Sequence, residues 1–307
     1  MSDTRLLAGT VPTVKDAGPL LFNRVSPEAR LRRAVDRFES SGIAPQAIVF
    51  TGDISELGEA GSYSLLRTII DPIAERLGAT VIWVPGERDS RAAFRVELLG
   101  QLPSDDSIDR VTFLDGLRVI TLDTSVPGSF YGHVEPEQLD WLAEELSAPA
   151  PYGTILAMHH PPIPSVIELD ASVELRNQSA LACVLSGSDV RTILAGHLHY
   201  SCTATFAGIP VSVASATCFT QDLTAPAGAQ RLVDGAQSYN LVTVFDDTVM
   251  HTVVPVTESP VLSHVSAEEA RRLLELEEVR FDESAIAVSR NAERTERPAP
   301  VWRVTGR

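Results

Sequence analysis

Short apolar runs alternate with helical patterns through the first 200 residues, and this alternation constrains the fold more than any other feature. Five runs are rich in aliphatic and β-branched residues and end in polar residues: 46–53, 79–87, 117–125, 153–160 and 190–199. Around and between them, four stretches carry apolar residues at helical spacing: 27–42, 61–78, 135–148 and 175–187. This order predicts an α/β fold in which helices cover a largely parallel sheet.

The pattern changes after residue 200. Residues 204–218 and 239–256 are typical of strands joined by turns, without a long helix between them, which predicts a second, more antiparallel sheet. Residues 259–281 carry one amphipathic helix, and the polar, proline-containing remainder is predicted to be loose. We therefore expect a main domain over 1–258 and a C-terminal helix with a loose tail over 259–307.

The charge and the apolar pattern exclude several partners. A formal net charge of −16 argues against nucleic acid and anionic membranes, because both attract basic surfaces. No run reaches the roughly 18 uninterrupted apolar residues of a membrane span, and no basic segment followed by an apolar one opens the chain as a secretory signal would. The three cysteines lack CxxC spacing, which fits reduced thiols. We expect a cytoplasmic protein.

The polar residues at the strand ends form an inventory of metal ligands. In open α/β sheets, ligands bind outside the carboxyl ends of the strands. Here those ends carry Asp53, Glu87, His159, His160, His197 and His199. Each motif alone has an ordinary explanation; Gly-Asp, for example, is a common turn sequence. Together, a bridging carboxylate, a further oxygen ligand and three imidazoles suit two divalent ions about 3.5–4 Å apart, an arrangement that hydrolyses phosphoesters.

The order of the motifs resembles the calcineurin-like metallophosphoesterases. The chain carries SDT, TGD, PGE, MHHPP and GHLH in that order. Within the family, MHHPPIP and LAGHLHY, followed by GIPVSVASAT, are most similar to class III 3',5'-cyclic-nucleotide phosphodiesterases, especially the actinobacterial members. The resemblance covers roughly residues 2–256. It implies a four-layer α-β-β-α sandwich with two mixed β-sheets and the metal ions between their tops.

The resemblance also implies a role for each ligand. Asp53 would bridge the two ions, His159 and His197 would hold the second ion, and His199 and Asp3 would hold the first. Glu87 stands where the family has an asparagine ligand. The implied cofactors are one or two Mn²⁺ or Fe²⁺/Fe³⁺ ions per chain, and a homodimer is expected because dimers are common among relatives.

Three positions of this reaction centre depart from the family pattern. The family's Asp-x-His reads Asp3-Thr4-Arg5, and its Gly-Asn-His-Asp reads Gly86-Glu87-Arg88-Asp89. Glu87 is a mild change, because a carboxylate binds Mg²⁺ or Mn²⁺ better than an amide. Arg5 cannot replace an imidazole ligand, because a guanidinium has no lone pair and stays charged. We therefore predict that the first ion is weakened or absent, with Arg5 paired to Asp3 or Glu87 in its place.

Arg88 stands where the family has the histidine that contacts the substrate phosphate and assists the leaving group. An arginine can stabilise charge on a phosphate oxygen, but it cannot donate a proton at neutral pH. Turnover should therefore fall most for poor leaving groups and least for activated aryl diesters.

The N-terminus raises a separate question. Only two residues precede Asp3, where the family has a buried strand. Either the start codon lies upstream, or the sheet lacks a strand and Asp3 is poorly fixed. We favour the upstream start, because loss of a central strand would expose unpaired backbone. Residues 5–26 are expected to form a long loop.

These features predict a metal-dependent phosphodiesterase that opens 3',5'-cyclic nucleotides such as cAMP to nucleoside monophosphates by attack of a metal-bound hydroxide. The alternative is a catalytically impaired homologue that retains one metal site and acts as a nucleotide-binding or interaction protein. Arg5 and Arg88 favour that alternative. A 2',3'-cyclic phosphodiesterase or a general phosphomonoesterase also stays open.

Overall fold

The computed structural model describes residues 1–8 and 19–276. Its first half contains α1 (Pro27–Glu39), β1 (Ala47–Thr51), α2 (Ala60–Leu77), β2 (Thr80–Val84) and α3 (Arg91–Leu99). The central part contains β3 (Arg110–Leu114), β4 (Leu117–Leu122), α4 (Pro136–Glu145), β5 (Thr154–Met158), a 3-10 turn (Glu168–Ser172), α5 (Gln178–Leu185) and β6 (Val190–Ala195). The last part contains β7 (Cys202–Phe206), β8 (Ile209–Val213), β9 (Thr220–Gln221), β10 (Leu232–Val233), β11 (Ser238–Val244), β12 (Val249–Pro255) and α6 (Ala267–Leu276).

The main sheet has six strands in the order β3-β4-β5-β6-β8-β7. The inner neighbours pair in parallel, and the outer pairs β3–β4 and β7–β8 are antiparallel. All five residues of β5 are buried, as an apolar run covered on both faces requires. Strands β1 and β2 pair in parallel in a separate sheet.

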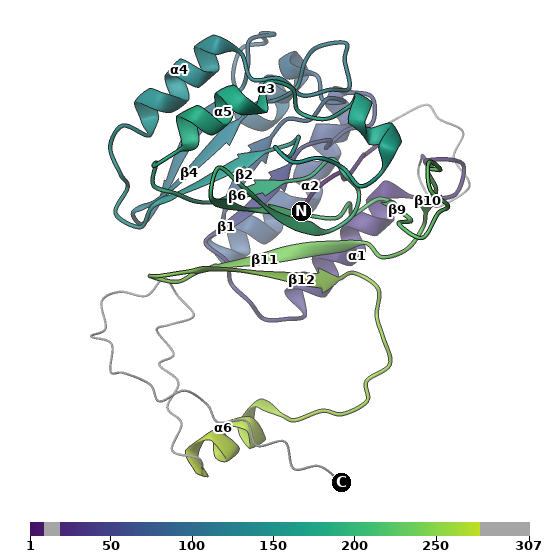
Figure 1. Cartoon of the computed structure of the whole chain (residues 1–307). Helices are drawn as coiled ribbons and strands as arrows, with labels where there is room; N and C mark the ends of the chain where they lie inside the picture. Colours follow the sequence, from purple (N-terminus) through teal and green to yellow (C-terminus); the bar gives the residue numbers. More distant parts are fainter. Residues whose placement is uncertain (9–18, 277–307) are drawn as a thin grey trace. The chain divides into compact units, whose positions relative to one another are not determined.

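Helices lie against the strands of these sheets (Figure 1). Their buried side chains form two apolar cores. Helices α4 and α5 contribute Leu142, Leu181 and Leu185 to the core of the six-stranded sheet. Helices α1, α2 and α3 pack with β1 and β2 around Phe50 and Trp83, whose rings stack. The expected α/β sandwich is therefore confirmed.

The chain after residue 200 differs from the expectation of a second antiparallel sheet. The stretch 204–218 contributes to β7 and β8, which extend the main sheet, because β8 pairs in parallel with β6. Strands β11 and β12, from the stretch 239–256, form a separate two-stranded sheet, and the short strands β9 and β10 form another. Strand β3 and helix α3 were not expected at all.

The first three residues extend the β1 edge. Thr51 N donates to Met1 O at 2.9 Å, and Asp3 N donates to Gly52 O at 3.1 Å. Ser2 forms a parallel bridge with Ala216 on the other side. Asp3 is thus fully buried and fixed by its backbone, in contrast to the alternative that leaves it poorly fixed.

The structure can be compared with the expected domain boundary at residue 258 and with the expected C-terminal helix. Of the described residues, 1–8, 19–243 and 249–259 form one compact unit, and 244–248 and 260–276, which include α6, form a second. The domain boundary at residue 258 stays a prediction. The whole of the expected loose tail, and residues 9–18 of the expected long loop, lie outside the described residues. Within the described part of the chain, no helix has the length and apolarity to cross a membrane.

Candidate active site

Two glycines let the strand-end loops approach each other. Gly52 follows β1 with φ +92°, and a Cβ there would lie 2.3 Å from His159 Nδ1. A Cβ at Gly86, which follows β2, would lie 2.3 Å from Asp53 Oδ1. These contacts are too short for any side chain, so only glycine lets the TGD and PGE loops pack against the site.

The backbone is strained where the side chains converge. Five of the eleven non-glycine residues with positive φ in the described chain belong to the site: Asp3, Arg5, Asp53, His197 and His199. Such conformations are costly and persist where the surrounding structure holds them, often at functional sites.

Glu87, His159 and His197 form the first of two ligand clusters. Glu87 Oε2 lies 2.7 Å from His159 Nε2 and 3.4 Å from His197 Nδ1. The far nitrogens are engaged by carbonyls, since His159 Nδ1 donates to Thr51 O at 2.7 Å and His197 Nε2 to Val173 O at 3.1 Å. Each imidazole therefore presents its other nitrogen to Glu87, as at metal sites where a carbonyl fixes the orientation of a ligating histidine.

The atoms of this first cluster fit a divalent ion. Within residues 1–8 and 19–276, the buried atoms Glu87 Oε2 and His159 Nε2 have no aligned hydrogen-bond partner, although they lie 2.7 Å apart. Asp53 Oδ1 lies 3.6 Å from His159 Nε2. Buried polar atoms without a partner are costly and call for an explanation such as an unseen ion. Two imidazoles and two carboxylates suit Mn²⁺, Fe²⁺ or Zn²⁺. His160 lies in the same cluster, with Nε2 3.6 Å from Glu87 Oε2.

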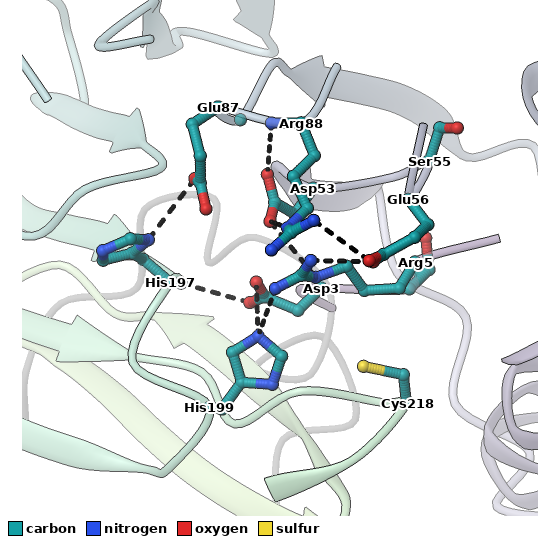
Figure 2. Close-up of polar contacts among 12 residues, drawn as sticks. Asp3, Arg5, Asp53, Ser55, Glu56, Glu87, Arg88, His197, His199 and Cys218 are labelled. Carbon is teal, nitrogen blue, oxygen red and sulfur yellow. Dashed lines mark hydrogen bonds and ion pairs between the residues drawn. The ribbon is translucent and has the colours of Figure 1, made fainter. Parts of the chain in front are cut away.

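Asp3, Asp53 and His199 form the second cluster, and Arg5 lies among them (Figure 2). His199 Nε2 lies 3.3 Å from Asp3 Oδ1, and His199 Nδ1 donates to Phe219 O at 2.9 Å. Arg5 Nε lies 3.2 Å from Asp53 Oδ2. Arg5 thus pairs with Asp53, a different partner from the Asp3 or Glu87 that the sequence suggested.

Glu56 connects the two arginines, as Figure 2 shows. Its Oε2 accepts from Arg5 Nη1 at 2.7 Å, and its Oε1 accepts from Arg88 Nη1 at 3.0 Å. Arg88 N also donates to Asp53 Oδ1 at 3.0 Å, and its guanidinium lies 5.3 Å from the centre of the Phe130 ring. Arg88 is partly exposed, so its guanidinium remains accessible to a phosphate.

Carboxylates dominate the charge of the site. Burial alone would lower the pKa of His159, but the Asp53 and Glu87 carboxylates raise it well above its ordinary value. Burial opposes ionisation of Glu87, yet His197 and His159 hold its pKa well below the usual range. His159 is therefore a protonated partner of Glu87 when no ion is bound. An ion that binds there must displace that proton, so its affinity should rise with pH.

The structure brings the expected ligands together around two clusters. Glu87, His159, His160 and His197 present ligand atoms within 4.8 Å of one another, and so do Asp3, Asp53 and His159. His199 Nε2 joins the second group at 3.3 Å from Asp3 Oδ1. Sequence reasoning missed Glu56 and Asp89. The charge balance was a signal for Glu56, because two arginines in a buried site require carboxylate partners.

Asp89 fixes the two loops that carry Asp53 and Glu87. Its carboxylate accepts hydrogen bonds from Gly86 N at 2.9 Å and from Ser55 N at 3.0 Å. It also accepts from Ile54 N at 3.2 Å and Tyr63 OH at 3.0 Å. Asp89 is thus a positioning residue that joins the TGD loop to the PGE loop.

A comparison with protein families decides the family. The family model for calcineurin-like phosphoesterases matches residues 24–201, which is more than half of the chain. This chain belongs to the calcineurin-like phosphoesterases. The resemblance read from the motifs is thereby confirmed, and membership is consistent with metal-dependent hydrolysis at the two clusters.

Two curated calcineurin-like relatives are similar along most of their length. The cAMP/cGMP dual specificity phosphodiesterase of Mycobacterium tuberculosis is 52% identical over 273 residues, which is 89% of this chain and 83% of that protein. A probable cyclic nucleotide phosphodiesterase of Rhodococcus erythropolis is also 52% identical, over 86% of this chain and 88% of that protein.

A solved structure supports the fold. The crystal structure of a dimetal phosphatase from Danio rerio superposes with a TM-score of 0.57 and 15% identity, covering 84% of this chain and 95% of that chain. At this identity, the likeness shows the calcineurin-like fold alone.

Proposed function

We propose that this protein hydrolyses 3',5'-cyclic nucleotides such as cAMP to nucleoside monophosphates with the help of a divalent ion. The observation that carries the proposal is the convergence of two imidazoles on one carboxylate. His159 Nε2 and His197 Nδ1 both lie within 3.4 Å of Glu87 Oε2. The family supports phosphoester chemistry. The substrate class is inferred from the names of the two relatives at 52% identity.

The residues of the site would have two roles, metal binding and phosphate binding. Glu87, His159, His197 and Asp53 would hold the ion, which supplies a Lewis acid that activates water and polarises the phosphate. Arg88 would bind a phosphate oxygen, since its guanidinium is accessible and lies beside the cluster. It stabilises the charge that develops in the transition state, but it cannot protonate the departing 3' oxygen.

The primary test is an assay of cAMP with and without Mn²⁺. After purification in a chelator, we expect no AMP until Mn²⁺ is added, and AMP formation at saturating Mn²⁺. A His197→Ala variant should lose this activity, while a His264→Ala variant, altered at an exposed histidine, should keep it. No AMP from the wild-type protein at any Mn²⁺ concentration would refute the proposal.

Arg88 gives a prediction about leaving groups. Arg88→His restores a group that can protonate the leaving oxygen, and general acids contribute about 10²–10⁴-fold. We expect kcat/KM for cAMP to rise by about tenfold or more relative to that for bis(4-nitrophenyl) phosphate, whose leaving group needs little protonation. Arg88→Gln, which removes the charge without adding an acid, should lower both. An unchanged ratio in Arg88→His would contradict the assigned role.

A second function is favoured by the position of Arg5. A guanidinium within 3.2 Å of Asp53 Oδ2 leaves an intact ligand set only at the other cluster. The protein would then bind nucleotides at one metal site without turning them over, as a nucleotide-binding or interaction protein. Calorimetry with cAMP and Mn²⁺ separates the two functions, because binding without any AMP release supports the second.

Three further properties stay predictions. We propose Mn²⁺ or iron as the native ion, a cytoplasmic location and a homodimer as the oligomeric state. The ligand chemistry supports the metals, because imidazole and carboxylate ligands suit both. The acidic charge supports the absence of nucleic acid as a partner.

A further inference from the structure

The Arg5 guanidinium lies between two expected metal ligands, Asp53 and His199, and the carboxylate of Glu56. Its Nε lies 3.2 Å from Asp53 Oδ2, and its Nη2 lies 3.3 Å from His199 Nε2. Its Nη1 donates to Glu56 Oε2 at 2.7 Å. All three nitrogens of the group therefore face an acceptor, as Figure 2 shows.

The imidazole contact depends on the tautomer of His199. Nδ1 of His199 faces the Phe219 carbonyl at 2.9 Å and must donate to it. In the neutral imidazole, Nε2 then carries a lone pair, and that lone pair faces a guanidinium N–H of Arg5. His199 Nε2, the nitrogen that could ligate a cation, thus faces a hydrogen-bond donor of Arg5.

Arg5 is fixed in this position. Its backbone N donates to Asp53 O at 3.0 Å, its side chain is buried, and its guanidinium lies 5.7 Å from the centre of the Phe219 ring. Glu56 holds the outer edge of the group and also binds Arg88. A buried guanidinium with two carboxylate partners does not leave without exposing both as unpaired charges.

We propose that Arg5 is a covalently attached replacement for one of two metal ions, so that this phosphodiesterase works with a single ion beside a fixed guanidinium. The proposal rests on the proposed function, because it assumes that the Glu87, His159 and His197 cluster holds a divalent ion. Arg5 is here a charge-compensating residue: it neutralises Asp53 and fills the space between Asp53 and His199. Among the described residues, Asp3 Oδ1 and Asp53 Oδ2 lack an aligned hydrogen-bond partner at that position, and Asp53 Oδ2 is paired with the charge of Arg5.

The first experiment uses the wild-type protein and does not depend on any variant. The chelator-treated protein is titrated with Mn²⁺, and bound ions are counted by elemental analysis and examined by electron paramagnetic resonance. We expect about one ion per chain and the spectrum of an isolated Mn²⁺, because ions about 3.5–4 Å apart would be magnetically coupled. About two tightly held ions with a coupled spectrum would overturn the inference.

The second experiment restores a ligand. Arg5→His removes the guanidinium and adds a lone pair beside Asp3, Asp53 and His199, so the bound Mn²⁺ should rise from about one to about two per chain with a coupled spectrum. Arg67→His makes the same change at an exposed helical arginine and should stay at about one. A folded Arg5→His protein that still binds one ion would overturn the inference, and thermal melting establishes whether it is folded.

The same samples separate this inference from the proposed function. If the wild-type protein binds one isolated ion but forms no AMP from cAMP, the role of Arg5 is supported and the proposed hydrolysis is refuted. If the wild-type protein binds two coupled ions and forms AMP, the proposed hydrolysis is supported and the role of Arg5 is refuted.

Discussion

Alanine in place of His159 is expected to remove Mn²⁺ binding and cAMP turnover, whereas alanine in place of the adjacent His160 leaves most of both. His159 Nδ1 is engaged by Thr51 O, so its Nε2 is the atom presented to Glu87, 2.7 Å away. His160 is engaged at both nitrogens, by Thr124 Oγ1 at 2.8 Å and Phe130 O at 3.3 Å. Burial, and then His197 and His159, hold the pKa of His160 well below its ordinary value, so it stays neutral.

The two substitutions should therefore distinguish a histidine that binds the metal ion from one that stabilises the fold. We expect His159→Ala to weaken Mn²⁺ binding by more than about 100-fold, because losing a residue that only hydrogen-bonds to a metal ligand already costs up to about that much. His160→Ala should weaken it by about tenfold or less and should lower the free energy of unfolding by about 1–3 kcal/mol through lost buried hydrogen bonds. Calorimetry with Mn²⁺ and urea unfolding measure the two quantities. Equal losses of Mn²⁺ affinity would show that both histidines ligate the ion.

The site could be predicted from sequence as far as parallel strands dictate it. Asp53 and His159 follow β1 and β5, and His197 and His199 follow β6, so the polar ends of buried runs marked the right residues. Their partners could not be predicted in this way. Glu56 lies in a loop after TGD without a periodic pattern, and its role depends on two arginines that reach it from positions 5 and 88.

Part of the fold was missed although the sequence carried signals for it. Helix α3 begins after Ser90, whose side chain caps Ala93 N, and ends before Gly100, which has φ +62°. Both are ordinary helix-boundary signals. Strand β8 was a different case, because its apolar run cannot reveal whether it joins β6 or starts another sheet. That choice is made by tertiary packing, which a single strand pattern does not encode.

Replacing Asp89 by alanine is expected to lower the free energy of unfolding by at least about 3 kcal/mol. The substitution leaves the buried N–H groups of Ile54, Ser55 and Gly86 without their acceptor, at about 1–3 kcal/mol for each orphaned donor. It also removes the partner of Tyr63 OH. Urea unfolding followed by circular dichroism, with the m-value checked for constancy, measures the change.

Asp71→Ala is the matched control, because Asp71 forms an exposed helical ion pair with Arg67 and its loss should cost no more than about 0.5 kcal/mol. Where Asp89→Ala still folds, the loops that carry Asp53 and Glu87 lose their common anchor. We therefore expect Mn²⁺ affinity to fall by about 10–100-fold, the usual effect of removing a residue that holds metal ligands in place. A variant with both the stability and the Mn²⁺ affinity of the wild-type protein would show that the backbone at Gly52 and Gly86 holds these loops without Asp89.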